Sequence, residues 1–328
     1  MPVSLEKKLE KARRKRDLSV FDVLSIDDLS MQDIELILKI AILFKEAETA
    51  KLSLLKDSTI ITAFYEQSTR TRLSFELAGK HLGADVVGTS AESSSLRKGE
   101  SLLDTMLTLA ALKPKVIVMR STDAGSQCFV AQHVPCAVVS AGDGWHEHPT
   151  QGLLDAKTML DHHGNMEKKV LTIIGDTLHS RVFGSLVRVA KKLGAKVRIA
   201  SPCTFIAQGV EEFGVEIFTN VEKALAGAHV ICALRVQEER GSTGFIPSLQ
   251  EYAKMYCMTS ERLALADKNA ILIHPGPVIR GVDVASDLVC HPQSKIREQV
   301  TNGLAVRKAV LWLLAKRYDK KTKPFSPA

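Results

Sequence analysis

Several features that mark other protein classes are scarce in this sequence of 328 residues. Aromatic residues make up only 5% of it, and no stretch approaches the roughly 18 apolar residues of a membrane-spanning helix. The charged N-terminus lacks the apolar core of a secretory signal peptide, so we expect a cytoplasmic protein. The six cysteines include no CxxC pair and lie mostly in apolar stretches, which indicates buried thiols rather than disulfides or a zinc site.

A broad basic surface is also missing, although the net charge is +7. Residues 6–17 hold seven basic and three acidic side chains, a net charge of +4, which leaves only +3 for the rest of the chain. With so few aromatic residues to stack on bases, we expect no nucleic-acid partner. We interpret the basic N-terminal stretch as a solvated helix or arm.

The composition that remains, 45% hydrophobic and 25% charged, is typical of a globular protein long enough for two domains. Apolar strands alternate with amphipathic helices, which predicts an α/β fold of two domains, each a parallel sheet flanked by helices. We place the domains at 1–149 and 150–292, with the C-terminal helix, 293–328, packing back on the first. The expected strands are 58–66, 84–90, 115–121, 136–142, 168–176, 195–202, 229–236 and 269–277. The expected helices are 30–48, 72–83, 102–112, 152–164, 185–194, 221–228 and 294–318, the first with a capping box from Ser30 to Asp33.

The stretch "QSTRTRLSF", residues 67–75, follows an apolar strand and opens a helix that we expect to begin near Thr69. The N-terminus of a helix favours anions, and an arginine there can bind two oxygens of a phosphate. The glycines and lysine of a P-loop are absent, so a small phosphorylated molecule fits better than a nucleoside triphosphate. The plainer alternative is that Ser68 caps the helix and the arginines are solvated.

Other predicted strands also end in polar residues, and the ends of parallel strands meet at one edge of a sheet, where ligands bind. These residues are Arg120; His146, His148 and Gln151; His179 and Arg181; Arg235, Gln237 and Arg240; and His274 and Arg280. His146 and His148 form an HxH pair, but no further metal ligands accompany it, so we expect no metal. For His146 and His179 a structural role is the alternative.

Two further motifs restrict the chemistry. "TIIGDTLHSR" follows a strand but lacks the GxGxxG glycines and an acidic residue for a ribose, so we expect no NAD, and no other cofactor is implied. "HPGPV" is a rigid loop in which Gly276 permits close backbone approach, and its bare carbonyls could accept from an amine. A tight turn without a ligand is the alternative.

Together these motifs resemble the aspartate/ornithine carbamoyltransferase superfamily, and within it the enzymes that transfer a carbamoyl group from carbamoyl phosphate to L-aspartate early in pyrimidine synthesis. The resemblance rests on "FYEQSTRTRLSFE", "KGESLLDT", "VMR", "AGDGWHEHPTQ", "RVQEER", "HPGP" and "REQVTNGLAVRKAVL", in that order. It covers nearly the whole chain after about residue 20. Ile279, where relatives often have asparagine, departs from the pattern.

The resemblance implies a role for each matching residue. The first domain would bind carbamoyl phosphate and the second aspartate, with the active site in the cleft between them. For carbamoyl phosphate the implied residues are Ser68, Thr69, Arg70, Thr71, Arg120, His148, Gln151, Ser95 and Lys98, of which Thr69, Arg70, Arg120 and His148 would be catalytic. For aspartate they are Lys98, Arg181, Arg235, Gln237, Pro275 and Gly276. Glu66 would pair with Arg181 and Arg240 when the domains close.

The resemblance also implies a homotrimer whose subunits share active sites, with Ser95 and Lys98 reaching a neighbour. The sequence leaves open whether Ser94 or Ser95 is the shared serine, and whether trimers associate with a regulatory chain or another pyrimidine enzyme. A transferase acting on ornithine is the nearest rival, but its site should offer an acidic group to the substrate's cation rather than "RVQ" and "HPGP". A non-catalytic homologue is a second rival; it would have lost Arg70, Arg120 or His148, which are all present.

Overall fold

The computed structural model describes residues 2–14, 16–47, 51–90, 99–237 and 244–326. The chain forms two compact units: unit 1 comprises Met1–Leu153 and Thr301–Ala328, and unit 2 comprises Leu154–Val300. Both divisions fall a few residues after the boundaries expected from the sequence. They lie inside two helices, α6 (Pro149–His163) and α11 (Ile296–Tyr318), which run through the divisions without a break.

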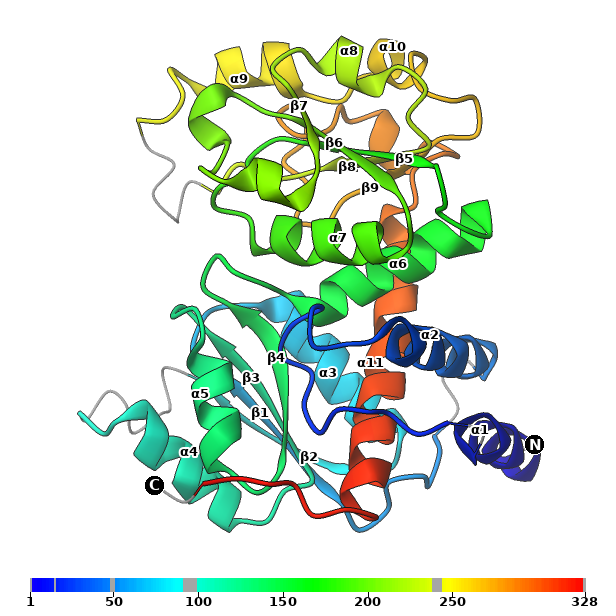
Figure 1. Ribbon diagram of the computed structural model, residues 1–328, viewed down its shortest axis with the longest axis vertical. Helices are drawn as coiled ribbons and strands as arrows, with labels where there is room; N and C mark the ends of the chain where they lie inside the picture. The colour runs from blue at the N-terminus through cyan, green and yellow to red at the C-terminus, as the bar shows by residue number, and fades with distance from the viewer. Residues whose placement is uncertain (1, 15, 48–50, 91–98, 238–243, 327–328) are drawn as a thin grey trace. The chain divides into compact units, whose positions relative to one another are not determined.

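Unit 1 is built on a parallel sheet of four strands in the order β2-β1-β3-β4 (Figure 1). The sheet pairs Phe64 with both Ser90 and Arg120, so β1 lies between β2 and β3 and their carboxyl ends share one edge. The strands are β1 Thr59–Phe64, β2 Asp85–Ser90, β3 Val116–Ser121 and β4 Ala137–Asp143. The helices that lie wholly in this unit are α1 Pro2–Arg14, α2 Met31–Glu46, α3 Thr69–His81, α4 Leu102–Ala111 and α5 Ser126–His133.

Helices cover both faces of this sheet because both faces are apolar. On one face, side chains of α4 and α5 such as Met106 and Val130 pack with Ile61, Ile117 and Val138 of the strands. The opposite face carries α3, with α11 packed beyond it (Figure 1). Strands buried on both faces read as continuous apolar runs, which is why the sequence predicts them well.

Unit 2 repeats the architecture with five parallel strands in the order β7-β6-β5-β8-β9. The strands are β5 Val170–Ile174, β6 Lys196–Ala200, β7 Glu216–Phe218, β8 Val230–Ala233 and β9 Ile271–Ile273. The helices are α7 Arg181–Lys192, α8 Val221–Leu225, α9 Leu249–Tyr256 and α10 Ser260–Leu263, with short 3₁₀ turns at Cys203–Phe205, Val210–Phe213 and Leu288–Cys290. The α/β class and the two parallel sheets expected from the sequence are therefore confirmed.

Four elements are additional to those expected: α5, α9, α10 and β7. The predicted capping box of α2 is confirmed, because the Ser30 hydroxyl accepts from the Asp33 backbone while the Asp33 carboxylate accepts from that of Ser30. Among the described helices, none is long and apolar enough to cross a membrane.

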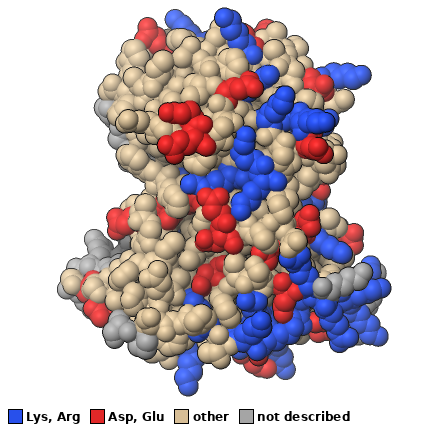
Figure 2. Space-filling view, in the orientation of Figure 1, with Lys and Arg blue, Asp and Glu red and all other residues tan. Residues whose placement is uncertain are grey.

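The N-terminal stretch, expected to be a solvated helix or arm, is a helix but is only partly solvated. Residues 2–14 form helix α1, which packs against α2 and buries Leu9, Ala12 and Arg13. Arg13 forms ion pairs with Glu10 (2.7 Å) and Asp17 (3.5 Å). The other described basic residues of the stretch remain exposed, and Lys and Arg side chains gather over this part of unit 1 (Figure 2). One face of the stretch is thus structural and the other is solvated.

Candidate functional site

In unit 1 the stretch at residues 67–72 lies at the carboxyl end of β1, next to β3. The sheet order reverses between these two strands, because β2 follows β1 on one side and β3 lies on the other. Such a reversal leaves a crevice at the strand ends in open α/β sheets. Helix α3 begins there at Thr69, so its first backbone N–H groups are directed at that edge.

The capping alternative for Ser68 is wrong. Ser68 occupies the N-cap position of α3 in an extended conformation, but its side chain makes no capping hydrogen bond. Thr69 and Arg70 are exposed, whereas Thr71 is buried and places its Oγ1 3.5 Å from His148 Nε2. The helix start therefore presents hydroxyl and guanidinium groups that capping does not use.

Arg120, near the end of β3, is the buried arginine among the candidate residues of unit 1, only 9% exposed. Its Nη1 donates to the carbonyl oxygen of Ala141 (3.2 Å), and its Nη2 lies 3.4 Å from Glu66 Oε1. These contacts come from the segments that follow β1 and end β4, so they orient the side chain at the same edge. Glu66, for which the resemblance implies partners in the second domain, thus has a partner in its own unit.

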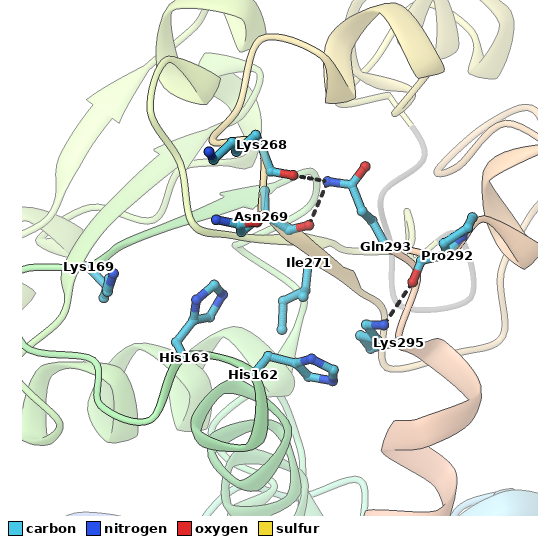
Figure 3. Close-up of a pocket in the computed structure, with 10 residues that line it drawn as sticks. His162, His163, Lys169, Lys268, Asn269, Ile271, Pro292, Gln293 and Lys295 are labelled. Carbon is cyan, nitrogen blue, oxygen red and sulfur yellow. Dashed lines mark hydrogen bonds between the residues drawn. The ribbon is translucent and has the colours of Figure 1, made fainter.

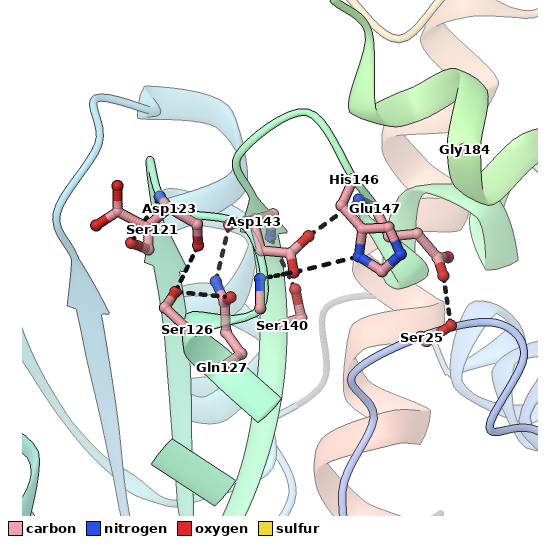
Figure 4. A network of polar contacts seen from close by, with 12 residues as sticks. Ser25, Ser121, Asp123, Ser126, Gln127, Ser140, Asp143, His146, Glu147 and Gly184 are labelled. Atoms are coloured by element: carbon pink, nitrogen blue, oxygen red, sulfur yellow. Dashed lines mark hydrogen bonds and ion pairs between the residues drawn. The ribbon is translucent and has the colours of Figure 1, made fainter. Parts of the chain in front are cut away.

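A polar network lies in the loop after β4 (Figure 4), directly before His148 and Gln151, which are both buried. Glu147 is fully buried and accepts hydrogen bonds from the Ser25 hydroxyl and from the Ile26 backbone (3.1 Å). Asp143 accepts from the Glu147 backbone (3.0 Å) and from that of Gly125 (3.1 Å). Sequence reasoning missed both carboxylates, although they lie within the "AGDGWHEHPTQ" motif.

His146 belongs to this network. Its Nδ1 lies 3.3 Å from Asp143 Oδ2 (Figure 4). No group of three or more His, Cys, Asp or Glu side chains suited to a metal is found among the described residues. The contact with Asp143 is what the structural alternative predicts for His146.

In unit 2 the candidate residues follow β5, β8 and β9, which are neighbours in the sheet. Gly175 ends β5 at a φ of +113°, and a Cβ there would lie 2.7 Å from the Leu234 carbonyl oxygen. Only glycine allows these two strand ends to approach so closely. The Tyr252 hydroxyl lies beside Gly175, 2.8 Å from where a Cβ would stand. Burial, followed by the charges of Asp283 and Asp176, raises the pKa of this hydroxyl and keeps it neutral.

Asp176 organises this edge as Asp143 does in unit 1. The fully buried carboxylate accepts from the backbone of His179 (3.0 Å) and of Gln237 (3.2 Å). His179 Nδ1 is 3.0 Å from Asp176 Oδ1 and therefore donates, because a carboxylate oxygen only accepts. His179 is thus structural, the alternative left open by the sequence, and it fixes the loop that precedes Arg181.

Two of the candidate arginines of unit 2, Arg181 and Arg235, differ in burial. Arg181 is 3% exposed and starts α7, whose N-cap residue Ser180 makes no side-chain capping bond. Arg235 is partly exposed, and its Nη2 donates to Gln237 Oε1 (3.1 Å). Both lie at the edge expected from the sequence.

The loop after β9 is held by buried polar groups. Gln299 accepts from the His274 backbone (2.9 Å), and the Gly276 backbone donates to His274 Nδ1 (2.8 Å). Asp283 lies 3.4 Å from His274 Nε2 and accepts from the Ile279 backbone (2.9 Å). Pro275 and Gly276 are thereby fixed beside the ends of β5 and β8. Of the other candidates, Ser94, Ser95, Lys98 and Arg240 lie outside the described residues.

Comparison with known proteins decides the family. Residues 22–161 match the family model "Aspartate/ornithine carbamoyltransferase, carbamoyl-P binding domain", and residues 167–314 match the "Asp/Orn binding domain". The chain is 48% identical over 296 residues to the aspartate carbamoyltransferase catalytic subunit of Beijerinckia indica, which covers 89% of this chain and 93% of that protein. The chain belongs to the aspartate/ornithine carbamoyltransferase family.

Solved members of this carbamoyltransferase family share the fold. Aspartate transcarbamoylase from Trypanosoma cruzi, solved with carbamoyl phosphate, is 28% identical with a TM-score of 0.80, over 89% of this chain and 95% of that one. Ornithine carbamoyltransferase from Pyrococcus furiosus is also 28% identical, with a TM-score of 0.79, over 89% and 96%. Because the aspartate and the ornithine enzyme fit equally well, the backbone alone does not show whether the second substrate is aspartate or ornithine.

Proposed function

We propose that this protein transfers the carbamoyl group of carbamoyl phosphate to the amine of L-aspartate, which gives N-carbamoyl-L-aspartate and phosphate. The observation that carries the proposal is an arginine pair at the ligand-binding edge of each unit: Arg70 with Arg120, and Arg181 with Arg235. The family relationship and the relatives named as aspartate carbamoyltransferases support it. Two anionic substrates need this much positive charge because they repel one another.

Unit 1 would hold carbamoyl phosphate. The phosphate would accept from Ser68, Thr71 and the first N–H groups of α3, and Arg70 would bind two of its oxygens. The carbamoyl group would lie by Arg120, His148 and Gln151. Thr69, Arg120 and His148 would donate to the oxygen that becomes negative in the transition state, and one such donor is typically worth about 3 kcal/mol.

Unit 2 would hold aspartate. Arg181 and Arg235 would face its two carboxylates, with Gln237 and the backbone of Pro275 and Gly276 completing the contacts. Ornithine carries a side-chain cation, which these arginines would repel. This charge difference, and not the fold, favours aspartate.

The chemistry then needs no side-chain nucleophile. The lone pair of the aspartate amine attacks the carbonyl carbon, the C–O bond to phosphate breaks, and the departing phosphate takes the amine proton. The protein contributes chiefly by binding both reactants in contact and by stabilising the oxyanion.

The first experiment measures product from the purified chain with carbamoyl phosphate and either aspartate or ornithine. We expect carbamoylaspartate, and an Arg70→Ala variant should raise the KM for carbamoyl phosphate about tenfold by losing an exposed charge-assisted contact. Arg72→Ala is the matched control, because Arg72 lies one turn into the same helix and pairs with Glu76 (2.8 Å). Product from ornithine, or an Arg70→Ala variant that behaves like the control, would refute the proposal.

The proposal includes a homotrimer. Leu73 and Leu77 on α3 are 52% and 46% exposed, and Val87 on the edge strand β2 is 56% exposed. Leu73 and Leu77 lie one turn apart on α3 and together offer an apolar surface that a second copy of the chain could cover. Val87 points to the other face of the sheet, because its neighbours Val86 and Gly88 face α3. Residues Ser95 and Lys98 would complete the neighbour's site. A native mass of three chains, reduced to one by Leu73→Glu with Leu77→Glu, would support this, and a monomeric parent would exclude it.

A place early in pyrimidine synthesis and a cytoplasmic location also belong to the proposal, and both rest on the family resemblance. Association of the trimer with a regulatory chain or another pyrimidine enzyme remains a separate question, which the mass of the native assembly answers.

A further inference from the structure

A second cluster of cations lies in unit 2 at the opposite edge of its sheet, where β5 and β9 begin. It lines a pocket of about 550 Å³ between the end of α6, the segments that lead into β5 and β9, and the segment before α11 (Figure 3). With about 3.3 Å per residue, the length of β5 separates it from the candidate residues by roughly 16 Å. The reaction proposed above makes no use of this pocket.

The lining is strongly cationic. It consists of His162, His163, Lys169, Lys268, Asn269, Ala270, Ile271, Pro292, Gln293 and Lys295. Three of these ten residues are lysines, two are histidines, and none is acidic. In Figure 3 Lys169 and Lys295 lie on opposite sides of the pocket, with Lys268 above them and Ile271 between. Clustered like charges in one pocket are unfavourable unless an anion offsets them.

Two carboxylates lie near the rim of the pocket, but none belongs to its lining, so the lining keeps a net positive charge. Glu298 binds His162 Nε2 (2.8 Å), and Asp267 lies close enough to Lys169 and Lys268 to interact electrostatically. Burial lowers the pKa of His163, and the charges of His229 and Lys169 lower it further. Burial also lowers the pKa of His229, and the charge of Lys169 acts in the same direction. A cation is therefore disfavoured on these rings, chiefly because they are partly buried and only secondarily because of the neighbouring charges.

Several polar groups are already fixed in place. Lys295 Nζ donates to the Pro292 carbonyl (2.8 Å), and Gln293 Nε2 donates to that of Ala270 (2.8 Å). His163 Nε2 lies 3.0 Å from the His229 carbonyl oxygen and donates to it. The buried side chain of Ile271 supplies an apolar floor. A pocket of this size and lining suits a small molecule with one charged part and one apolar part.

We propose that this pocket binds a diphosphate group, held between Lys169, Lys268 and Lys295. A diphosphate carries several negative charges over a short span, so it can contact lysines on more than one side of the pocket. Lysine binds phosphate as a point charge and needs no planar partner. The group could come from free pyrophosphate or from an organic diphosphate whose apolar part covers Ile271.

The test uses the full chain carrying Arg70→Ala, which weakens phosphate binding at the proposed reaction site. Calorimetric titration compares pyrophosphate, ADP and inorganic phosphate. We expect pyrophosphate to bind at least about tenfold more tightly than phosphate, and Lys169→Gln with Lys268→Gln to lower its affinity at least about tenfold. Tighter binding of ADP than of pyrophosphate would identify an organic diphosphate as the source; equal or weaker binding would identify the free ion.

A local readout keeps the result independent of the reaction proposed above and of any folding defect. Acetylation of lysines in the chain without substitutions is followed by mass spectrometry, with and without pyrophosphate. We expect protection of Lys169, Lys268 and Lys295 and none of Lys223, which is exposed on α8. Lys223→Gln is the matched substitution and should leave affinity unchanged. Equal acetylation with and without pyrophosphate, or an unchanged affinity in a folded double variant, would overturn the proposal.

Discussion

The two units use the same kind of sheet edge but place their arginines in opposite ways. In unit 1 the buried arginine, Arg120, belongs to a strand, and the exposed one, Arg70, belongs to a helix. In unit 2 the buried arginine, Arg181, starts a helix, and the more exposed one, Arg235, follows a strand. Each edge thus combines one deeply buried guanidinium with one that is more exposed to solvent.

From this exchange we infer that anion binding depends more on the burial of the guanidinium than on whether a strand or a helix carries it. A buried guanidinium has lost water, so its interaction with an anion is stronger than that of an exposed one, and its position is fixed before the ligand arrives. In unit 1 the supporting partners are the Ala141 carbonyl and Glu66. The comparison predicts that the buried arginines matter most, and that each affects only its own substrate.

Arg120→Ala should have the largest effect. It removes one of the donors proposed for the developing oxyanion, together with the ion pair to Glu66. We expect kcat to fall about 1,000-fold, as for loss of one strong oxyanion donor, with a smaller change in KM for aspartate. Steady-state kinetics with both substrates measures the two effects. A rise in KM for aspartate with kcat intact would break the assignment of Arg120 to the other substrate.

Arg181→Ala comes next. A buried guanidinium facing a carboxylate contributes a charge-assisted pair, so we expect the KM for aspartate to rise about 100-fold. The KM for carbamoyl phosphate should stay within about twofold of the parent value. Lys191→Ala, in the last turn of the same helix, is the control and should change neither constant. If Arg181→Ala raised the KM for both substrates equally, the assignment of one substrate to each unit would be wrong.

The sequence predicted the ligand-binding edges of the two sheets well, because short stretches of sequence are enough to identify buried strands and the residues that follow them. Apolar runs identified the buried strands, and parallel strands bring their carboxyl ends together, so Arg120, His148, Arg181 and Arg235 could be placed on the proper edges without coordinates. Helix α5 was missed because its eight residues, SQCFVAQH, show little amphipathic pattern. The need for a crossover between the parallel strands β3 and β4 would have revealed it. Strand β7 was missed because it is only three residues long and mostly exposed.

The supporting carboxylates could not be predicted in the same way. Asp143, Glu147 and Asp176 lie beside the expected residues in sequence, but their function depends on partners that only the fold brings close. Glu147 binds Ser25 and Ile26, which lie more than 120 residues earlier in the chain. A carboxylate before HPTQ could equally be solvated, so residue type and spacing alone did not single it out.

Glu147→Gln tests the role of these supporting carboxylates and should have an intermediate effect on activity. The amide would place a donor or a weaker acceptor opposite the Ile26 N–H, which loosens the loop that carries His148. We expect kcat to fall about tenfold, and the free energy of unfolding of unit 1 to drop by about 1–3 kcal/mol. The KM for aspartate should not change, because Glu147 acts through His148 and not on that substrate.

Asp176→Asn is the counterpart of Glu147→Gln in unit 2. Its carboxylate fixes His179 and Gln237, so its loss should raise the KM for aspartate and leave that for carbamoyl phosphate unchanged. Kinetics of the two variants side by side sharpens the comparison. If the two variants changed the KM values for both substrates in the same way, neither loop would act on one substrate alone.

The smallest effect is expected away from both edges, at the start of α2. Burial alone would raise the pKa of the Asp33 carboxyl, but hydrogen bonds from Ser19 and Ser30 lower it. A carboxylate whose pKa is lower in the folded state stabilises the protein above its unfolded value, near 4, and this contribution disappears as the pH falls through the folded value. Helix α9 begins with Ser248, whose side chain accepts from the Glu251 backbone. Since a serine hydroxyl does not titrate in this range, that cap should show no comparable pH dependence.

Asp33→Asn should therefore destabilise unit 1 by about 1 kcal/mol at pH 7, and the difference from the parent should shrink below pH 4. Ser248→Ala should cost a similar amount, because it also removes a cap, but its effect should be the same at pH 7 and pH 3.5. Thermal unfolding of both variants across this range measures the contrast. A constant gap for Asp33→Asn would mean that neutral hydrogen bonds, and not the ionised carboxylate, stabilise this cap.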